Sequence, residues 1–250
     1  MRYKAILCDV DRTLIVAEDA LPTPAVTRAL RRLQDQVHVG LASSRPLTEL
    51  RHIFDYLELS GPSIVSNGAQ IVDVKTGNYV RESILPSDII DKIHRIVQAF
   101  GHPSDYWVQD DGTDYQLDDS YIPNKPLVIV AHDVTHDTAN CLIDQVSDLD
   151  VFAIKAPTYT KGFVDVHITN QSASKGDSVK HVASYLGIST AEIIGAGDGY
   201  NDLPLLKACG LRVAMGNAVP ELKRVADFVA PSVEDDGLAV MIAKFFPAAQ

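Results

Sequence analysis

Short apolar runs alternate with amphipathic stretches along the first third of the chain. The stretches carry apolar residues at the spacing of one helix face, as at Val26, Leu30 and Leu33. The pattern predicts strands at residues 3–7, 37–42 and 63–66 and helices at 23–34 and 46–57. This order, strand–helix–strand–helix–strand, is typical of a parallel α/β sheet.

The pattern changes in the middle third, where strands and helices no longer alternate regularly. Residues 69–73 and 78–82 flank Lys75-Thr76-Gly77, which predicts a hairpin. Further strands are predicted at 105–108, 113–117, 127–131, 151–154 and 163–168, and helices at 86–100 and 138–146. This mixture predicts a separate α+β unit inserted into the first one.

The regular alternation of strands and helices returns from Ser174 onward. Helices are predicted at 174–186, 200–209, 219–225 and 236–246, and strands at 192–196, 211–215 and 227–229. The last third therefore completes the sheet begun by the first third. The predicted fold class is α/β, with a doubly wound, mostly parallel sheet and an inserted α+β unit.

Composition and charge narrow the functional classes. The chain has 250 residues, of which 46% are hydrophobic and 22% charged, as in an ordinary soluble globular protein. The net charge of -11 repels nucleic acids and anionic membranes, so we expect neither as a partner. No apolar run reaches the ~20 residues that span a bilayer, and the N-terminus lacks the features of a signal peptide. We therefore expect a cytoplasmic protein.

Three cysteines, Cys8, Cys141 and Cys209, are scattered along the sequence. Neither their number nor their spacing suggests a disulfide framework or a zinc site. Cys8 adjoins an aspartate and could act as a nucleophile, but strand alternation directs its side chain away from that aspartate. We expect a buried apolar thiol at this position.

Two aspartates follow the first predicted strand at a spacing of two residues. Asp9 and Asp11 can point to one side, because side chains two apart in a strand share a face. Two buried carboxylates are costly unless a cation joins them, so the chain must supply a partner or recruit a metal. A solvated pair of loop aspartates is the alternative.

Other polar residues lie where later strands of the predicted sheet end, the edge at which open α/β sheets bind ligands. Ser43 and Ser44 follow the second strand just before a helix, where anions bind well, although helix capping is an alternative role. A glycine-rich segment follows the strand at 192–196. We expect four carboxylates to meet at this edge, those of Asp9, Asp11, Asp198 and Asp202.

The charge of such a cluster favours a divalent cation. Like charges about 4 Å apart repel by on the order of 4 kcal/mol at an effective dielectric constant near 20. A single lysine such as Lys175, which could instead be a solvated surface residue, would not offset several carboxylates and a phosphate. Because the candidate ligands are all oxygens, Mg²⁺ is favoured over Zn²⁺.

These residues resemble the motifs of the haloacid dehalogenase superfamily of phosphatases, in particular its Cof-type branch. Residues 9–13, Asp-Val-Asp-Arg-Thr, are similar to the first motif, Asp-x-Asp-Gly-Thr, with Arg12 in the place of glycine. Ser43 corresponds to the second motif and Lys175 to the third, and residues 197–202, Gly-Asp-Gly-Tyr-Asn-Asp, correspond to the fourth. The resemblance covers both flanking thirds of the chain, and four motifs in this order are highly specific.

The resemblance implies a Mg²⁺-dependent phosphatase that works through an aspartyl-phosphate. Asp9 would be the nucleophile, and Asp11 the general acid and base. Mg²⁺ would be held by Asp9, the main-chain carbonyl of Asp11 and Asp198, with Asp202 nearby or acting through water. The residues implied to bind the substrate are Ser43, Ser44, Arg45, Lys175 and Asn201.

The resemblance also implies a catalytic core, residues 1–79 and 172–250, and an inserted cap, residues 80–171, that selects the substrate. The expected partner is a small phosphorylated metabolite, such as a sugar phosphate or phosphoglycolate, and the expected assembly is a monomer or homodimer. A phosphomutase and a non-enzymatic phospho-acceptor or binding module are the alternatives.

Two further clusters of potential metal ligands lie in the predicted cap. Residues 105–119 contain six aspartates but lack the spacing of a calcium loop, so we expect a solvated hairpin there. His132 and His136 are four residues apart, with Asp133 and Asp137 beside them. They could form a second metal site, but no further ligand is evident, and we do not expect one.

Overall fold

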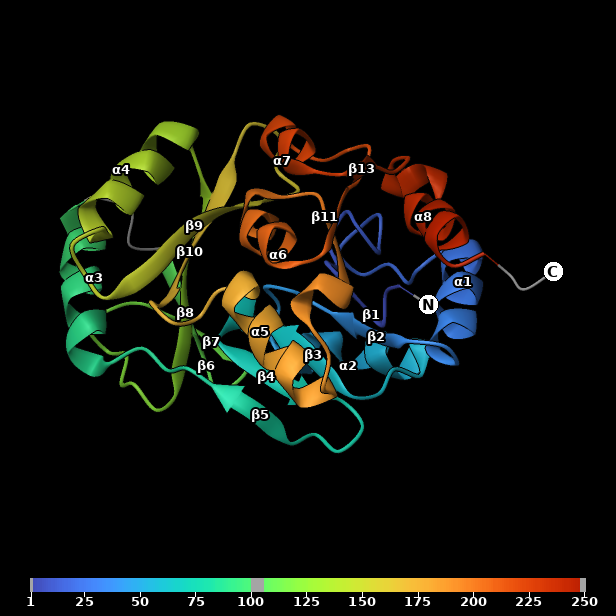
Figure 1. Cartoon of the computed structure of the whole chain (residues 1–250). Coiled ribbons are helices and arrows are strands. Elements are labelled where there is room, and N and C mark those ends of the chain that lie inside the picture. The colour runs from blue at the N-terminus through green and yellow to red at the C-terminus, as the bar shows by residue number, and fades with distance from the viewer. Residues whose placement is uncertain (1, 100–105, 248–250) are drawn as a thin grey trace.

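The computed structural model describes residues 2–99 and 106–247 of the chain. Its main sheet has five parallel strands in the order β13-β12-β11-β1-β2 (Figure 1). They are β1 (Ala5–Cys8), β2 (His38–Leu41), β11 (Ile193–Gly197), β12 (Leu211–Ala214) and β13 (Phe228–Val229). The first and last thirds of the chain therefore build one sheet, as predicted.

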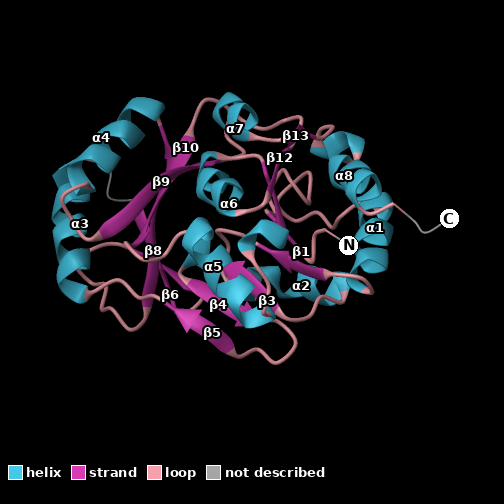
Figure 2. Cartoon of the chain, viewed as in Figure 1, coloured by secondary structure: helices cyan, strands magenta, loops and turns pink. Residues whose placement is uncertain are grey.

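Helices cover both faces of the parallel sheet (Figure 2). On one side α1 (Pro24–Gln34) packs against α8 (Gly237–Phe245), and on the other α5 (Lys175–Leu186) packs against α6 (Leu203–Ala208). The shorter α7 (Pro220–Val225) packs beside α6, and α2 (Leu47–Leu57) lies near α1. This arrangement confirms the predicted doubly wound α/β class.

Local signals in the sequence fix where these helices begin and end. Thr23 caps α1, because its Oγ1 accepts a hydrogen bond from the Val26 N–H at 3.2 Å. Ser174 caps α5 in the same way, accepting from the Asp177 N–H at 3.0 Å. Gly187 ends α5 in the left-handed conformation with a φ of 65°. The capped start of α5 brings Lys175 to the carboxyl edge of the sheet.

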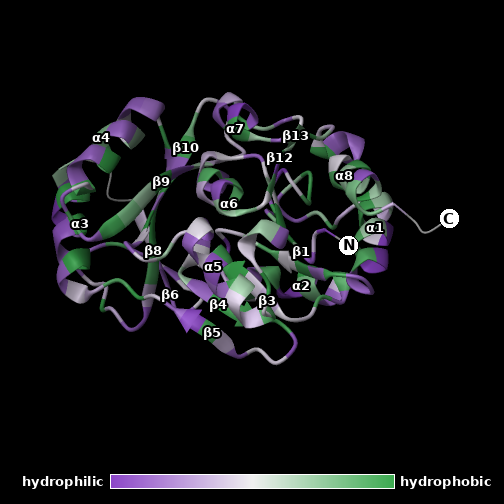
Figure 3. Ribbon diagram, viewed as in Figure 1, coloured by the Kyte–Doolittle hydropathy of each residue, from purple (hydrophilic) through white to green (hydrophobic). Residues whose placement is uncertain are grey.

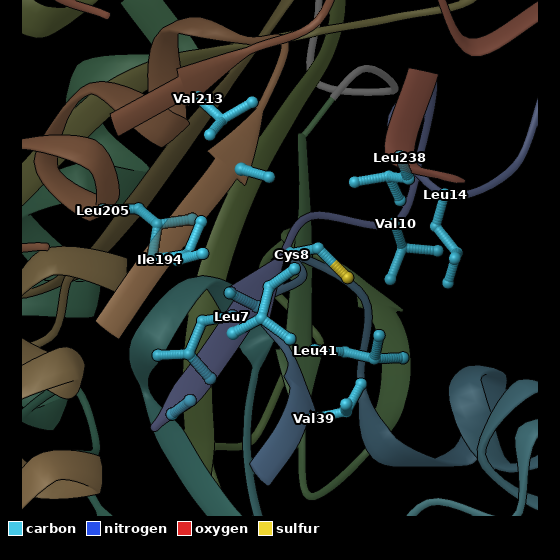
Figure 4. Packing of buried hydrophobic residues seen from close by; sticks show 14 of the residues in the cluster. Leu7, Cys8, Val10, Leu14, Val39, Leu41, Ile194, Leu205, Val213 and Leu238 are labelled. Atoms are coloured by element: carbon cyan, nitrogen blue, oxygen red, sulfur yellow. The ribbon is translucent and has the colours of Figure 1, made fainter. Parts of the chain in front are cut away.

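The apolar core around β1 fixes the position of the residues that follow it. All four β1 residues are buried, and Leu7 and Cys8 lie among the side chains of neighbouring strands (Figure 4). Burial raises the pKa of the Cys8 thiol to about 12, so it stays protonated. The expectation of a buried apolar thiol is confirmed.

The third predicted strand exists but does not extend the parallel sheet. β3 (Pro62–Val65) pairs antiparallel with β4 (Gln70–Asp73), which pairs with β5 (Tyr79–Glu82). Asn67 reverses the chain between β3 and β4 with a φ of 53°. In the described part of the chain, only an isolated bridge between Ala42 and Ile64 joins β3 to the end of β2. The predicted hairpin at 69–82 is confirmed, and it draws the third strand into its own sheet.

A second five-stranded sheet, entirely antiparallel, is built from the middle of the chain in the order β7-β6-β8-β10-β9. Its strands are β6 (Tyr106–Asp110), β7 (Thr113–Gln116), β8 (Pro126–Val134), β9 (Val151–Pro157) and β10 (Val164–Asn170). One face is covered by α3 (Ser87–Ala99) and α4 (His136–Val146), which turn their hydrophilic sides outward (Figure 3). Phe100 and Asp105, which we expected in a helix and a strand, lie outside the described residues.

The buried apolar side chains form two large clusters. One draws on residues 3–74 and 179–246, and the other on residues 85–168. The parallel sheet and the three-stranded sheet therefore share one core, and the five-stranded antiparallel sheet has its own. Among the described residues, no helix has the length and apolar content that a bilayer crossing requires.

Candidate active site

Three of the four predicted carboxylates meet at the carboxyl edge of the parallel sheet. Cys8 of β1 pairs with Ala196 of β11, so the residues that follow these two strands are neighbours. Asp9, Asp198 and Asp202 are 6%, 2% and 0% exposed, and one carboxylate oxygen from each lies within 4.8 Å of the others. The alternative of solvated loop aspartates is thereby excluded for Asp9.

The loop after β11 is held by Asp202. The Asp202 Oδ2 accepts hydrogen bonds from the N–H groups of Asp198 at 3.0 Å and Gly199 at 2.9 Å. Gly197 makes this contact possible, because a Cβ there would lie 2.4 Å from the Asp202 Cγ. Asp202 therefore positions the loop that presents Asp198 to Asp9.

Lys175 lies between two of the three carboxylates. Its Nζ donates to Asp9 Oδ1 at 2.6 Å and to Asp202 Oδ1 at 2.7 Å, and its side chain is fully buried. Burial alone would lower the pKa of Lys175, but Asp202 and Asp9 raise it above its ordinary value. Lys175 is thus a buried cation, and the alternative of a solvated surface lysine is excluded.

One lysine does not neutralise this cluster. Burial, and then the charge of Asp202, raise the pKa of Asp9 well above its ordinary value. The same two causes raise the pKa of Asp198 to about 7. Asp9 and Asp198 therefore hold protons more strongly than ordinary aspartates do, and a further bound cation would favour their ionised forms. Three closely spaced carboxylate oxygens are ligands suited to Mg²⁺, so the residues present fit a divalent cation.

We expect the stability of the metal-free protein to fall as the pH rises from about 4 to about 7. Asp198 has a pKa of about 7 when folded, against an ordinary value of 3.8. Between these values the folded state holds a proton that the unfolded state has released, so a higher pH costs on the order of 4 kcal/mol. Urea unfolding in EDTA at pH 5.0 and 7.5 measures this slope. Asp198→Asn should flatten the slope, and an unchanged slope in that variant would contradict the assignment.

The carboxylate of Asp11 does not belong to the cluster, so the expectation that all four carboxylates meet is wrong for this residue. Its carboxylate accepts hydrogen bonds from the guanidinium of Arg45, with the Nε at 2.9 Å, and from the Tyr159 hydroxyl at 2.9 Å. Burial alone would lower the pKa of Arg45, but its bond to Asp11 raises it. Asp9 and Asp11 both line one cavity, but of these two residues only Asp9 belongs to the carboxylate cluster.

The residues expected to bind the substrate divide into two groups. Ser44, Arg45 and Asn201 line the cavity together with Asp9. Ser43 is fully buried, and its Oγ accepts a hydrogen bond from the Arg45 N–H at 3.1 Å. Ser43 therefore shapes the turn that carries Arg45.

Arg12 takes the left-handed conformation that glycine would adopt without strain, with a φ of 58°. Its Nε lies 3.5 Å from Asp198 Oδ2, and its carbonyl accepts from the Asn217 Nδ2 at 2.8 Å. The arginine thus brings a second cation to the edge of the cluster, which the resemblance did not predict.

The cavity has a volume of about 450 Å³ and lies between the carboxyl edge of the parallel sheet and the five-stranded antiparallel sheet. Its lining includes Tyr159, Gln109 and His167, which the sequence analysis did not single out. Tyr159 sits in a loop and has no local signal. Asp165 and His167, however, alternate with Val164, Val166 and Ile168, a pattern that places polar groups on one face of β10.

The two further clusters in the middle of the chain serve local contacts. Asp110 is buried and accepts hydrogen bonds from the Tyr121 hydroxyl at 2.5 Å and the Asn124 N–H at 2.8 Å. The Nδ1 of His132 lies 3.4 Å from Asp165 Oδ2. Within the described ranges, the acidic cluster around Asp9 is the one group arranged to hold a metal ion.

Comparison with known proteins identifies relatives along nearly the whole chain. The family model of haloacid dehalogenase-like hydrolases matches residues 6–148 and 111–242. The phosphoglycolate phosphatase of Methanopyrus kandleri is 26% identical over 96% of this chain and 95% of that protein. The 5-amino-6-(5-phospho-D-ribitylamino)uracil phosphatase of Bacillus subtilis is 25% identical over 96% of this chain and 97% of that protein.

Solved structures show the same fold. A haloacid dehalogenase-like hydrolase from B. subtilis matches with a TM-score of 0.83 at 21% identity, covering 96% of this chain and 98% of that one. A sugar phosphatase of subclass IIB of the superfamily matches with a TM-score of 0.80 at 18% identity, covering 97% and 98%. The chain therefore belongs to the haloacid dehalogenase-like hydrolases, the family that its motifs indicate, and it is a phosphatase of that family.

Proposed function

We propose that the protein is a Mg²⁺-dependent phosphatase that hydrolyses small phosphomonoesters, such as sugar phosphates, through an aspartyl-phosphate. The observation that carries this proposal is the buried carboxylate cluster, in which Asp9 opens to a cavity large enough for a small metabolite. The named relatives act on phosphoglycolate and on a phosphorylated ribityl compound, and a structural neighbour is a sugar phosphatase.

Asp9 is the proposed nucleophile. Lys175 holds its Oδ1, so Oδ2 is the proposed attacking atom. A bond from Asp9 Oδ2 to phosphorus forms while the bond from phosphorus to the leaving oxygen breaks. Water then attacks phosphorus, the bond to Oδ2 breaks, and inorganic phosphate leaves. Asp9 would attack as the ionised carboxylate, a form that a bound cation would favour by opposing the rise in pKa caused by burial and by Asp202.

Asp11 is the proposed general acid and base. It would give a proton to the leaving oxygen in the first step and take one from the attacking water in the second. Its carboxylate lies on the cavity wall, outside the cluster, where a leaving group can be reached. Arg45 and Tyr159 hold this carboxylate from two sides, so they fix the direction from which a proton would be delivered.

The proposed Mg²⁺ ligands are Asp9, the main-chain carbonyl of Asp11, and Asp198. Both oxygens of Asp202 already accept hydrogen bonds, from Lys175 and from two N–H groups, which supports a contact through water. When bound, Mg²⁺ would offset the negative charge of the nucleophile and the phosphate. Ser44, Arg45 and Asn201 are proposed to orient the phosphoryl oxygens, with Ser43 supporting the turn that carries Arg45.

Residues 80–171 are the proposed cap over a core of residues 1–79 and 172–250. Tyr159 reaches from this segment to Asp11, so the cap contributes directly to the site. The loop that carries Tyr159 is held by Asp133, whose carboxylate accepts from the hydroxyls of Thr158 at 2.6 Å and Thr160 at 2.8 Å. A cap over the site would exclude water during phosphoryl transfer.

Hydrolysis of 4-nitrophenyl phosphate with and without Mg²⁺ tests the proposed function. We expect turnover in 5 mM Mg²⁺ and a loss of at least ~100-fold after EDTA treatment, restored by added Mg²⁺. A phosphomutase would instead transfer the group between sugar positions with little release of phosphate. Hydrolysis that is insensitive to EDTA would contradict the metal assignment, and no release of phosphate would contradict the hydrolase.

A further inference from the structure

Arg12 occupies a loop position at which the main chain favours glycine. Its φ of 58° lies in the left-handed region, which costs free energy for a residue with a Cβ and little for glycine. The loop itself is held by main-chain atoms of this residue. The Arg12 N–H donates to the Ile15 carbonyl at 2.8 Å, and the Arg12 carbonyl accepts from Asn217 Nδ2. Glycine would make both bonds without strain, so the arginine side chain is a candidate for a functional role.

The guanidinium of Arg12 lies at the wall of the cavity with most of its donors unused. The side chain is 36% exposed, and its Nε forms a loose ion pair with Asp198 Oδ2 at 3.5 Å. Within residues 2–99 and 106–247, the guanidinium makes no hydrogen bond and no other ion pair. Arg45, which also lines the cavity, is instead engaged through its guanidinium with Asp11. Arg12 therefore brings donors to the cavity that a ligand can use.

The formal charges show that Arg12 affects cations and anions in opposite ways. Asp9, Asp198 and Asp202 contribute three negative charges when ionised, and Lys175 and Arg12 contribute two positive ones. A divalent cation would therefore bind a group of net charge -1, whereas the same group without Arg12 would carry -2. Once that cation is bound, a phosphate dianion would meet a net charge of +1 instead of zero. Coulomb's law then predicts weaker cation binding and stronger phosphate binding.

The position of Arg12 places both kinds of ligand near its charge. Asp198 is a proposed Mg²⁺ ligand, so a bound cation would share this carboxylate with the guanidinium, and the two positive charges would repel each other. Asp9, the proposed nucleophile, lines the same cavity as Arg12. A phosphoryl group at Asp9 would therefore face a guanidinium, whose planar set of donors suits phosphate oxygens.

We propose that Arg12 binds the phosphoryl group of the substrate and, in the metal-free protein, pairs with Asp198 in competition with Mg²⁺. This inference rests on the proposed phosphatase function, and it assigns a role to the residue that takes the place of glycine in the first motif. Mg²⁺ bound at Asp198 would weaken the ion pair of Arg12, and the guanidinium would then turn to the phosphoryl oxygens.

Isothermal titration calorimetry with MgCl₂ alone, and with inorganic phosphate in saturating Mg²⁺, tests the proposal. The titrations are made at pH 8.5, where Asp198, with its pKa of about 7, is ionised. Arg12→Gln removes the charge but keeps a side chain with a Cβ, so the backbone strain is unchanged. We expect it to lower the Kd for Mg²⁺ about 10-fold and to raise the Kd for phosphate about 10-fold. Arg12→Lys keeps the charge and should hold both values within about threefold.

Arg28→Gln is the matched control, because it removes the same charge from an exposed position on α1. It should leave both Kd values within about twofold. Arg12→Gly, which relieves the strain at this position, provides a second variant should Arg12→Gln fold poorly, and the same two shifts are expected of it.

The opposite signs of the two shifts separate the proposal from a purely structural role of Arg12. Damage to the loop would weaken the binding of Mg²⁺ and of phosphate together, and that result in a folded Arg12→Gln protein would overturn the proposal. An unchanged affinity for either ligand would also overturn it, as would an Arg12→Lys protein that behaves like Arg12→Gln. Absence of Mg²⁺ binding by the unmodified protein would instead contradict the proposed function, and this inference with it.

Discussion

Replacing Asp9 by asparagine is expected to lower kcat at least ~10⁴-fold while the protein stays folded. The amide has nearly the same shape as the carboxylate but is a poor nucleophile, so the phosphoryl group would have no acceptor. Folding should be preserved because Lys175 keeps its contact with Asp202, and because the pKa of Asp9 is already raised by burial and by Asp202. Steady-state hydrolysis of 4-nitrophenyl phosphate in Mg²⁺, together with urea unfolding, measures both effects.

Asp88→Asn is the matched control for this substitution. Asp88 lies exposed on α3, where it pairs with Lys92 at 3.0 Å, far from the parallel sheet's carboxyl edge. Its kcat should stay within about twofold of the unmodified protein, since an exposed helix pair contributes little. A kcat for Asp9→Asn within tenfold of the unmodified protein would mean that the nucleophile lies elsewhere.

The position of the carboxylate cluster could be predicted from the sequence, because the order of the strands determines it. Apolar runs mark the ends of β1 and β11, and parallel strands present their carboxyl ends at one edge, so Asp9 and Asp198 could be expected to meet. The buried state of Lys175 was less evident. A lysine at a helix start looks the same in sequence whether it faces solvent or two carboxylates, and only the packing of α5 against the sheet edge decides.

Other features depend on contacts between distant segments. β3 joins an antiparallel sheet because Asn67 takes a left-handed conformation, which the hydrophobic pattern does not encode. Tyr159 meets Asp11 across 148 positions of sequence, and no local pattern relates the two. The polar residues of β10, Asp165 and His167, lie between these cases. Their alternation with apolar residues is visible in the sequence, but their place in the lining of the cavity is a property of the folded chain.

Replacing Lys175 by methionine is expected to destabilise the metal-free protein by about 3–5 kcal/mol at pH 7.5, because it leaves buried carboxylates without their cation. The Nζ of Lys175 contacts Asp9 and Asp202 at 2.6 and 2.7 Å, and the side chain has no exposed surface. The loss should be smaller at pH 5.0, since carboxylates with raised pKa values take up protons there. Urea unfolding in EDTA at the two pH values measures the difference.

Mg²⁺ provides a second test of the same variant. A cation that binds only the folded state at 100 times its dissociation constant adds about 2.7 kcal/mol of stability, so saturating Mg²⁺ should recover much of the loss. Lys180→Met is the control: Lys180 lies on the same helix, 69% exposed, and pairs with Asp177 at the surface, so its removal should cost less than about 1 kcal/mol. Equal losses in the two variants would show that Lys175 does not offset the cluster. A large loss of stability that Mg²⁺ does not reverse would show that Lys175 stabilises the cluster, and it would contradict the proposed metal site.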